Sequence, residues 1–309
     1  MATTMSEFAA TPWDQPIHQV AMPLLAVKDG QTWASGTAFL IGPAMAITAW
    51  HVVEDFLLRL DGAVPPPGGS EAGFEVLTYL SLEHGARQIP LKVMRYWHSE
   101  PLDIVILGLG VPADFPDDHR WIVPKITLLP PRRGAEIIAF GFANGSVDGK
   151  VQPHPAELVD GNVQPHPAWS VQPRTSTGRV VEIHHEFRDS ARAPFPCYHV
   201  NARFDGGMSG GPVIDKASGA ICGMIHSSYP AISEGEEHAS YVATLWPMLA
   251  VPVDRGPNTS EFPLMDLYKS GDLVADDLDR IQMRITPAGQ PQIRARHPQA
   301  EWDSPSNSA

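Results

Sequence analysis

One serine of this chain stands in a glycine-rich segment that could support acyl transfer. Residues 205–215 read DGGMSGGPVID, which places Ser209 between Gly207 and the pair Gly210 and Gly211, ahead of a short apolar strand. Glycine tolerates the positive φ angles of a tight turn, so the backbone N–H groups of Gly207 and Ser209 can converge beside the hydroxyl. Two such donors stabilise the oxyanion of acyl transfer. An ordinary glycine hairpin without chemistry is the alternative interpretation.

A serine hydroxyl is a weak nucleophile until a neighbouring base accepts its proton. Among the 13 histidines of the chain, His51 has the most informative surroundings. It lies near the end of the second of two apolar runs, 33–42 and 45–53, that are separated by a turn and read as strands. An isolated histidine after a strand would more simply be structural, but this context favours a base that the fold delivers to Ser209.

The imidazole of such a base needs a buried carboxylate on its other nitrogen. Asp103 stands directly before the apolar run IVILGL, where burial without a partner would be costly. Glu54 and Asp55 are closer to His51 in the sequence, but we expect them in a short exposed helix that follows it. Asp103 is therefore the predicted partner of His51.

The segments around these residues resemble those of chymotrypsin-like serine peptidases. GMSGGP at 207–212 matches the GxSGGP nucleophile loop of the family, and DIVIL at 103–107 is similar to its D(I/L)A(L/V)L strand. GTAFLIGPAMAITAWHV at 36–52 resembles its GTGF…LTAAHV pattern, with Trp50 in place of the usual small residue. The resemblance thus involves three separate segments.

Chain order and two further motifs extend this resemblance. The order histidine, aspartate, serine is that of chymotrypsin-like enzymes and differs from the order in subtilisins and α/β-hydrolases. AFGFANG at 139–145 and TSTGRVVEI at 175–183 resemble two strands of the second barrel in HtrA-like proteases. The likeness covers about residues 20–250 and favours a bacterial trypsin-like or HtrA-like protease domain. We expect no PDZ domain after it, because too few residues follow.

This resemblance implies an all-β fold of two six-stranded Greek-key β-barrels with a short C-terminal extension. The many short apolar runs and the 31 prolines and 26 glycines agree with strands joined by turns. We expect an N-terminal arm over 1–19, a first barrel with His51 and Asp103 over 20–120, and a second barrel with Ser209 over 121–255. Residues 256–309 form the extension, which we expect to be partly disordered.

The implied activity is that of a serine endopeptidase that works through an acyl-enzyme. His51, Asp103 and Ser209 would be the catalytic triad, and the N–H groups of Gly207 and Ser209 the oxyanion hole. No cofactor is implied. A catalytically silent relative that uses the barrels as a binding module is the alternative. Met208 replaces an aspartate that many secreted members pair with a newly cleaved N-terminus, so we expect no activation of that kind.

Two strands of the second barrel line the pocket for the side chain before the scissile bond in this family. Arg203 and His226 fall on the corresponding segments, 201–207 and 223–229. They could give charge-assisted hydrogen bonds to an acidic substrate side chain. The alternative is that Arg203 points outward and His226 belongs to the core.

A duplicated hexapeptide contains the one histidine pair that suggests a metal. VQPHPA occurs at 151–156 and at 163–168, and carries His154 and His166. Prolines flank both histidines, and no cysteine or carboxylate ligand spacing accompanies them. We predict a surface loop and no metal site.

Composition limits the partners. A formal charge of −13 and the absence of a basic run argue against a nucleic-acid surface. The two cysteines are predicted to be free thiols. The sequence contains no apolar run of 18 residues, which is the length expected of a membrane-spanning helix. We expect a cytoplasmic protease of restricted specificity, for processing, defence or stress. Its partners would be a protein or peptide substrate and an activating or target protein.

Overall fold

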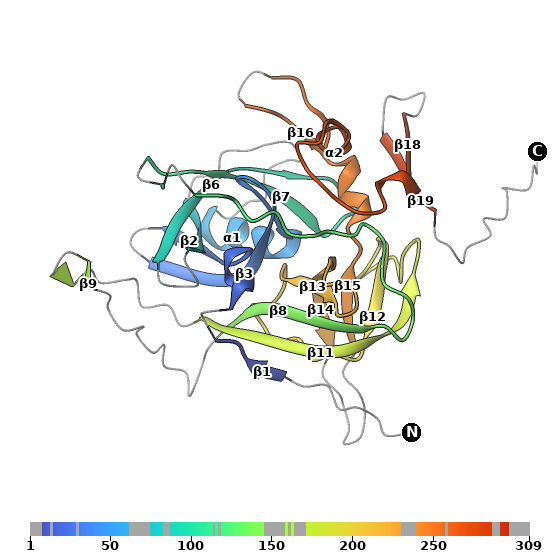
Figure 1. The fold of residues 1–309 in the computed structure, drawn as a ribbon, viewed down its shortest axis with the longest axis horizontal. Helices are drawn as coiled ribbons and strands as arrows, with labels where there is room; N and C mark the ends of the chain where they lie inside the picture. The colour runs from blue at the N-terminus through green and yellow to red at the C-terminus, as the bar shows by residue number, and fades with distance from the viewer. Residues whose placement is uncertain are drawn as a thin grey trace, which may run out of the picture.

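The structure is a computed structural model, shown in Figure 1. It describes residues 8–12, 15–28, 31–61, 75–82, 87–113, 115–116, 119–144, 158–159, 162–163, 171–229, 239–256, 259–285 and 291–296. His154 and His166 of the duplicated hexapeptide, and the C-terminal stretch beyond 296, lie outside these residues.

The first half of the chain forms a closed six-stranded barrel. Its strands, in the order β2-β3-β4-β7-β6-β5, are all antiparallel, and β5 pairs with β2 to close the ring. Their bounds are Ala21–Lys28 (β2), Gln31–Gly42 (β3), Met45–Ala49 (β4), Glu75–Leu82 (β5), Arg87–His98 (β6) and Ile104–Gly110 (β7). Apolar side chains such as Leu24, Phe39 and Ile106 fill the interior without solvent contact.

Six further strands form the second barrel. They run in the order β11-β12-β15-β14-β13-β8, and an additional β11–β8 pairing joins the two ends. Their bounds are Glu136–Asn144 (β8), Val171–His184 (β11), Cys197–Val200 (β12), Pro212–Asp215 (β13), Ile221–Tyr229 (β14) and Ala239–Ala243 (β15). The two-barrel prediction from the sequence is confirmed.

Short elements lie outside the barrels. β1 (Phe8–Ala10) adds to β11 beneath the second barrel (Figure 1), and a 3-10 helix, η1, spans Pro16–Gln19. Leu158–Val159 (β9) and Asn162–Val163 (β10) form a small hairpin. The C-terminal part contains η3 (Trp246–Ala250), β16 (Pro252–Val253), β17 (Phe262–Pro263), α2 (Met265–Ser270), η4 (Leu278–Arg280), β18 (Ile281–Ile285) and β19 (Pro291–Ala295).

The C-terminal segment packs on both the first barrel and the connection between the barrels. Asp254 accepts hydrogen bonds from Arg95 and from the Trp97 indole of β6. Farther along, the N–H group of Asp276 donates to Ile126, and the Thr127 hydroxyl donates to Asp277 at 2.7 Å. The extension is therefore integrated with the fold over its described residues.

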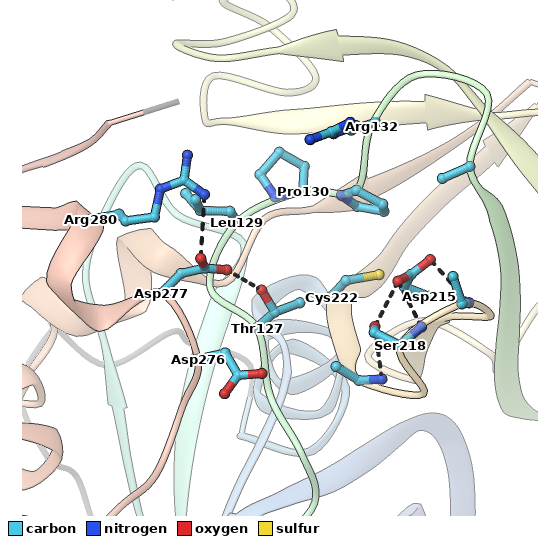
Figure 2. Close-up of a pocket in the computed structure, with 14 residues that line it drawn as sticks. Thr127, Leu129, Pro130, Arg132, Asp215, Ser218, Cys222, Asp276, Asp277 and Arg280 are labelled. Carbon is cyan, nitrogen blue, oxygen red and sulfur yellow. Dashed lines mark hydrogen bonds and ion pairs between the residues drawn. The ribbon is translucent and has the colours of Figure 1, made fainter. Parts of the chain in front are cut away.

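A cavity of about 690 Å³ lies where this segment meets the connection and the β13–β14 turn (Figure 2). Arginine, aspartate and proline side chains line it, together with the buried Cys222. His51, Asp103 and Ser209 are not among its lining residues. This cavity is therefore separate from the residues predicted to be catalytic.

The structure corrects one boundary near the predicted base. The run 45–53 was expected as a strand, but β4 ends at Ala49 and helix α1 spans Trp50–Asp61. Within α1 the apolar side chains of Val52, Val53, Phe56 and Leu57 are buried on one face. This spacing is that of an amphipathic helix, and burial of its face against the barrel overrides the β propensity of the valines.

Two smaller observations concern the thiols and membrane spans. Cys197 and Cys222 are free and buried, and burial raises the pKa of each thiol to about 12. Neither thiol is therefore poised for nucleophilic chemistry. Within the described ranges no helix has the length and apolar character to cross a membrane.

Candidate active site

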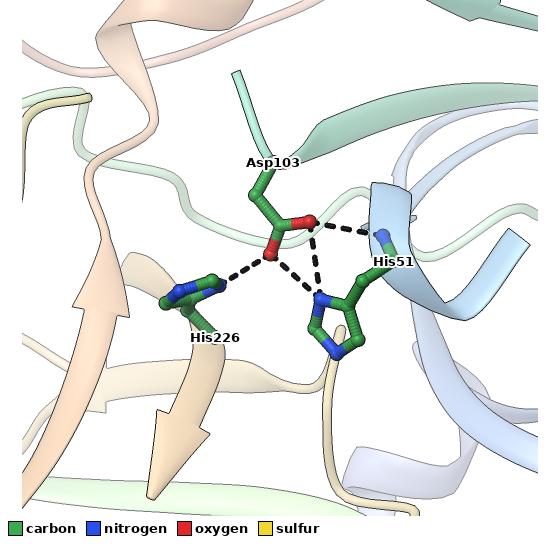
Figure 3. A group of neighbouring side chains, drawn as sticks. All are labelled: His51, Asp103 and His226. Atoms are coloured by element: carbon green, nitrogen blue, oxygen red, sulfur yellow. Dashed lines mark hydrogen bonds and ion pairs between the residues drawn. The ribbon is translucent and has the colours of Figure 1, made fainter. Parts of the chain in front are cut away.

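His51 and Asp103 meet at the end of the first barrel (Figure 3). His51 is the second residue of α1, and Asp103 immediately precedes β7. The Nδ1 atom of His51 lies 2.9 Å from Oδ2 and 3.1 Å from Oδ1 of Asp103. The backbone N–H of His51 also donates to Oδ1, at 3.0 Å. These bonds fix both the ring orientation and the tautomer that carries its hydrogen on Nδ1.

The pKa values of the pair follow from burial and mutual attraction. Burial alone would raise the pKa of Asp103, but hydrogen bonds from His226 and His51 outweigh it and hold that pKa well below its usual range. Burial lowers the pKa of His51, yet the hydrogen bond and the charge of Asp103 raise it more, so the net pKa lies above 6.5. The carboxylate stays ionised and ready to stabilise an imidazolium.

Ser209 lies in a turn of the second barrel that depends on glycine. Gly207 and Gly210 have φ angles of +89° and +84°, in the left-handed region that glycine tolerates. A Cβ on Gly210 would come within 2.2 Å of the Thr37 carbonyl oxygen and the Thr48 hydroxyl. The Ser209 hydroxyl donates to the backbone carbonyl of His226 at 3.3 Å. Within the described residues it makes no hydrogen bond to His51.

Two backbone donors of this turn are free. The N–H groups of Met208, Gly210 and Gly211 are bonded to Asp205, Ile225 and Met208 respectively. In the described part of the chain, the N–H groups of Gly207 and Ser209 have no such partner. They are therefore available to an acceptor placed beside the Ser209 hydroxyl.

Comparison with known proteins identifies the family. The model of the trypsin-like peptidase domain matches residues 36–224, more than half of the chain, and this range contains His51, Asp103 and Ser209. The chain belongs to the trypsin-like peptidase domain family. Membership confirms the predicted enzyme class, a serine peptidase. No curated protein matches the chain.

The chain is also similar to solved structures of two proteins. The active form of the Rv3671c protease from M. tuberculosis is 17% identical, with 76% of this chain and 83% of that chain covered and a TM-score of 0.44. Its inactive form is 19% identical, with coverages of 76% and 91% and a TM-score of 0.43. Deg5 is 15% identical, with coverages of 74% and 85% and a TM-score of 0.46.

The raised pKa of His51 predicts the pH dependence of the peptidase. The neutral imidazole is the form that accepts a proton, so kcat/KM should increase as pH rises through that pKa, with a midpoint above 6.5. Conversely, the stability contributed by protonated His51 is complete below 6.5 and is lost as pH rises through the raised pKa. Initial rates on a peptide substrate across pH test this, and a midpoint below 6.5 would contradict it.

Thr37 of β3 holds the nucleophile turn, a role that the sequence analysis did not assign. Its side chain is fully buried, and its hydroxyl donates to the Gly207 carbonyl at 3.0 Å and accepts from the N–H of Phe142 at 2.9 Å. Its backbone N–H donates to the Ser209 carbonyl at 2.9 Å. One residue of the first barrel therefore fixes the turn of the second. The available signal was a single polar side chain within the otherwise apolar run 36–41.

Replacing Thr37 by valine should destabilise the peptidase and slow it. The Gly207 carbonyl and the Phe142 N–H would lose their buried partner, which costs about 1–3 kcal/mol for each unsatisfied group. Because the turn also carries the free donors, kcat should fall together with the free energy of unfolding. Denaturant titration and steady-state kinetics measure both. Thr37→Ser, which keeps the hydroxyl, is the control, and equal effects of the two substitutions would contradict the assignment.

Arg203 and His226 do not converge on an open specificity pocket. Arg203 donates to Asp205 at 2.7 and 3.0 Å, and its guanidinium lies 4.7 Å from the centre of the Phe8 ring. Both ring nitrogens of His226 face internal acceptors, Asp103 and the carbonyl of Arg192. These contacts do not favour the predicted recognition of an acidic side chain, which stays a prediction.

Among the described residues, one group of side chains could hold a metal ion. The donor atoms of His51, Asp103 and His226 lie within 4.8 Å of one another. Two imidazoles and a carboxylate are a ligand set that zinc accepts. The same atoms, however, form the hydrogen bonds that orient His51. Metal binding and the orientation of His51 by Asp103 are therefore mutually exclusive.

Proposed function

We propose that this peptidase is a serine endopeptidase that cleaves peptide bonds through an acyl-enzyme. His51, Asp103 and Ser209 are its triad, and the N–H groups of Gly207 and Ser209 form its oxyanion hole. The observation that carries the proposal is the position of His226. Its ring contacts Asp103 while its carbonyl accepts the Ser209 hydroxyl, so the nucleophile turn lies beside the oriented pair of His51 and Asp103.

Acylation follows from these groups. The Ser209 proton leaves the His226 carbonyl and passes to Nε2 of His51 while Oγ bonds to the substrate carbonyl carbon. The two free N–H groups donate hydrogen bonds to the developing oxyanion. Asp103, still ionised, stabilises the imidazolium. When the C–N bond breaks, His51 returns the proton to the leaving amine, and the acyl group stays on Ser209.

Deacylation repeats the chemistry with water. His51, again neutral, removes a proton from the water that attacks the acyl carbon, and the same donors hold the second oxyanion. The Ser209–carbon bond then breaks and Ser209 recovers its proton from His51. The chemistry requires no cofactor.

The biological setting is proposed on the sequence alone. The enzyme would be cytoplasmic, would act with narrow specificity on a protein or peptide, and would be controlled by a partner. The lack of an 18-residue apolar run supports the compartment. A broadly active protease in that compartment would damage its host, which supports restricted specificity.

Turnover of a peptide library, with sequencing of the products, tests the proposal. We expect internal cleavage at a restricted set of bonds and the same rate with and without EDTA. The residue before each cut also shows whether acidic side chains are preferred. Absence of cleavage and of labelling by a fluorophosphonate would favour a silent binding module, and loss of the rate in EDTA would contradict the cofactor-free mechanism.

A further inference from the structure

His226 occupies an irregular position of β14. Along the β14–β15 ladder, Ile225 pairs with Val242 and Ser227 pairs with Tyr241, so His226 is an extra residue between two consecutive partners. Such a bulge redirects the side chain of the extra residue. Here the imidazole reaches Asp103, a residue of the other barrel, and its Nδ1 lies 2.5 Å from Oδ2 (Figure 3).

The surroundings of the His226 ring define its hydrogen-bonding state. Nδ1 faces the carboxylate of Asp103, and Nε2 lies 3.2 Å from the carbonyl oxygen of Arg192. A neutral imidazole has one N–H group, and the ionised carboxylate is the stronger of the two acceptors, so Nδ1 donates to Asp103. The side chains of His226 and Asp103 are only 13% and 8% exposed, so water does not substitute readily for the bond between them.

The Asp103 carboxylate uses both oxygens in this arrangement. Oδ1 accepts the backbone N–H of His51, Nδ1 of His51 lies near both oxygens, and Oδ2 also meets His226. The Phe195 ring packs edge-on against His226, with centroids 5.0 Å apart. The carboxylate is thus held from the first barrel by His51 and from the second by His226.

We propose that His226 is a positioning residue that holds Asp103 in register with His51 and ties it to the segment 192–195. This inference rests on the proposed function of the triad. The charged or titratable groups that face the ring are Asp103 and His51, with Glu54 and Asp55 of α1 beyond His51 and Arg192 on the segment behind it.

Two substitutions at this position separate positioning from folding. His226→Ala removes both bonds and should lower kcat about 10–100-fold, with little change in KM, which corresponds to the loss of a charge-assisted hydrogen bond. His226→Asn keeps a donor near Nδ1 and should recover most of kcat. His185→Asn, in an exposed histidine of the neighbouring segment, should leave kcat and KM unchanged.

Nitrogen NMR of the His226 ring at pH 7 adds a measurement that does not depend on activity. We expect Nδ1 to carry a hydrogen, which it donates to Asp103. A ring whose Nδ1 carries no hydrogen, or equal kcat for Ala, Asn and wild type, would overturn the proposal while leaving the triad intact. If the wild type neither cleaves nor is labelled, the proposed function fails, and His226 as a positioning residue fails with it.

Discussion

Replacing Ser209 by alanine should lower kcat by about 10⁴-fold or more, because a triad without its nucleophile cannot form the acyl-enzyme. The hydroxyl makes a single 3.3 Å hydrogen bond, to the His226 carbonyl, so its removal should change thermal stability little. Steady-state hydrolysis of a fluorogenic peptide, with a melting curve of each protein, separates lost chemistry from lost folding.

Ser218→Ala is the matched control for this substitution. Ser218 is exposed in the turn after β13, and its hydroxyl bonds to Asp215 at 2.6 Å. Its replacement should leave hydrolysis unchanged. Residual activity of Ser209→Ala within tenfold of the wild type would mean that another group is the nucleophile.

Replacing Asp103 by asparagine should lower kcat about 10⁴-fold by disturbing the tautomer of His51. Three donors point at the two carboxylate oxygens, namely the backbone N–H and Nδ1 of His51 and Nδ1 of His226. An asparagine offers one acceptor oxygen, and its NH₂ group would face one of these donors. The expected result is a large loss of kcat with a smaller change in KM.

Asp266→Asn is the control for this second substitution. Asp266 is exposed on α2, and its neutralisation should affect neither kcat nor the pH profile. If Asp103→Asn retained wild-type kcat, Asp103 would not be the orienting acid, and Glu54 or Asp55 would have to be tested instead.

Local motifs made much of this fold predictable. Short apolar runs separated by turn residues correspond to strands of both barrels. The expectation of a helix after His51 was right, but its start was placed too late. Trp50, Val52 and Val53 continue the apolar pattern of β4, and only their packing decides that they are helical.

The contacts between barrels were not predictable in the same way. The Thr37 hydroxyl binds a carbonyl 170 positions away in the chain, and no local pattern encodes that approach. The position of His226 depends on a bulge between β14 and β15, which arises from the register of two paired strands. From the family resemblance, His226 was predicted to contact the substrate. In the structure its ring contacts Asp103 instead.

Labelling with a fluorophosphonate, mapped by mass spectrometry, tests the central claim most directly. The reagent phosphonylates a serine only where a base and an oxyanion hole activate it. We expect one adduct, on Ser209, that is absent from Ser209→Ala and strongly reduced in Asp103→Asn. An adduct on another residue, or a folded wild type that remains unlabelled, would contradict it.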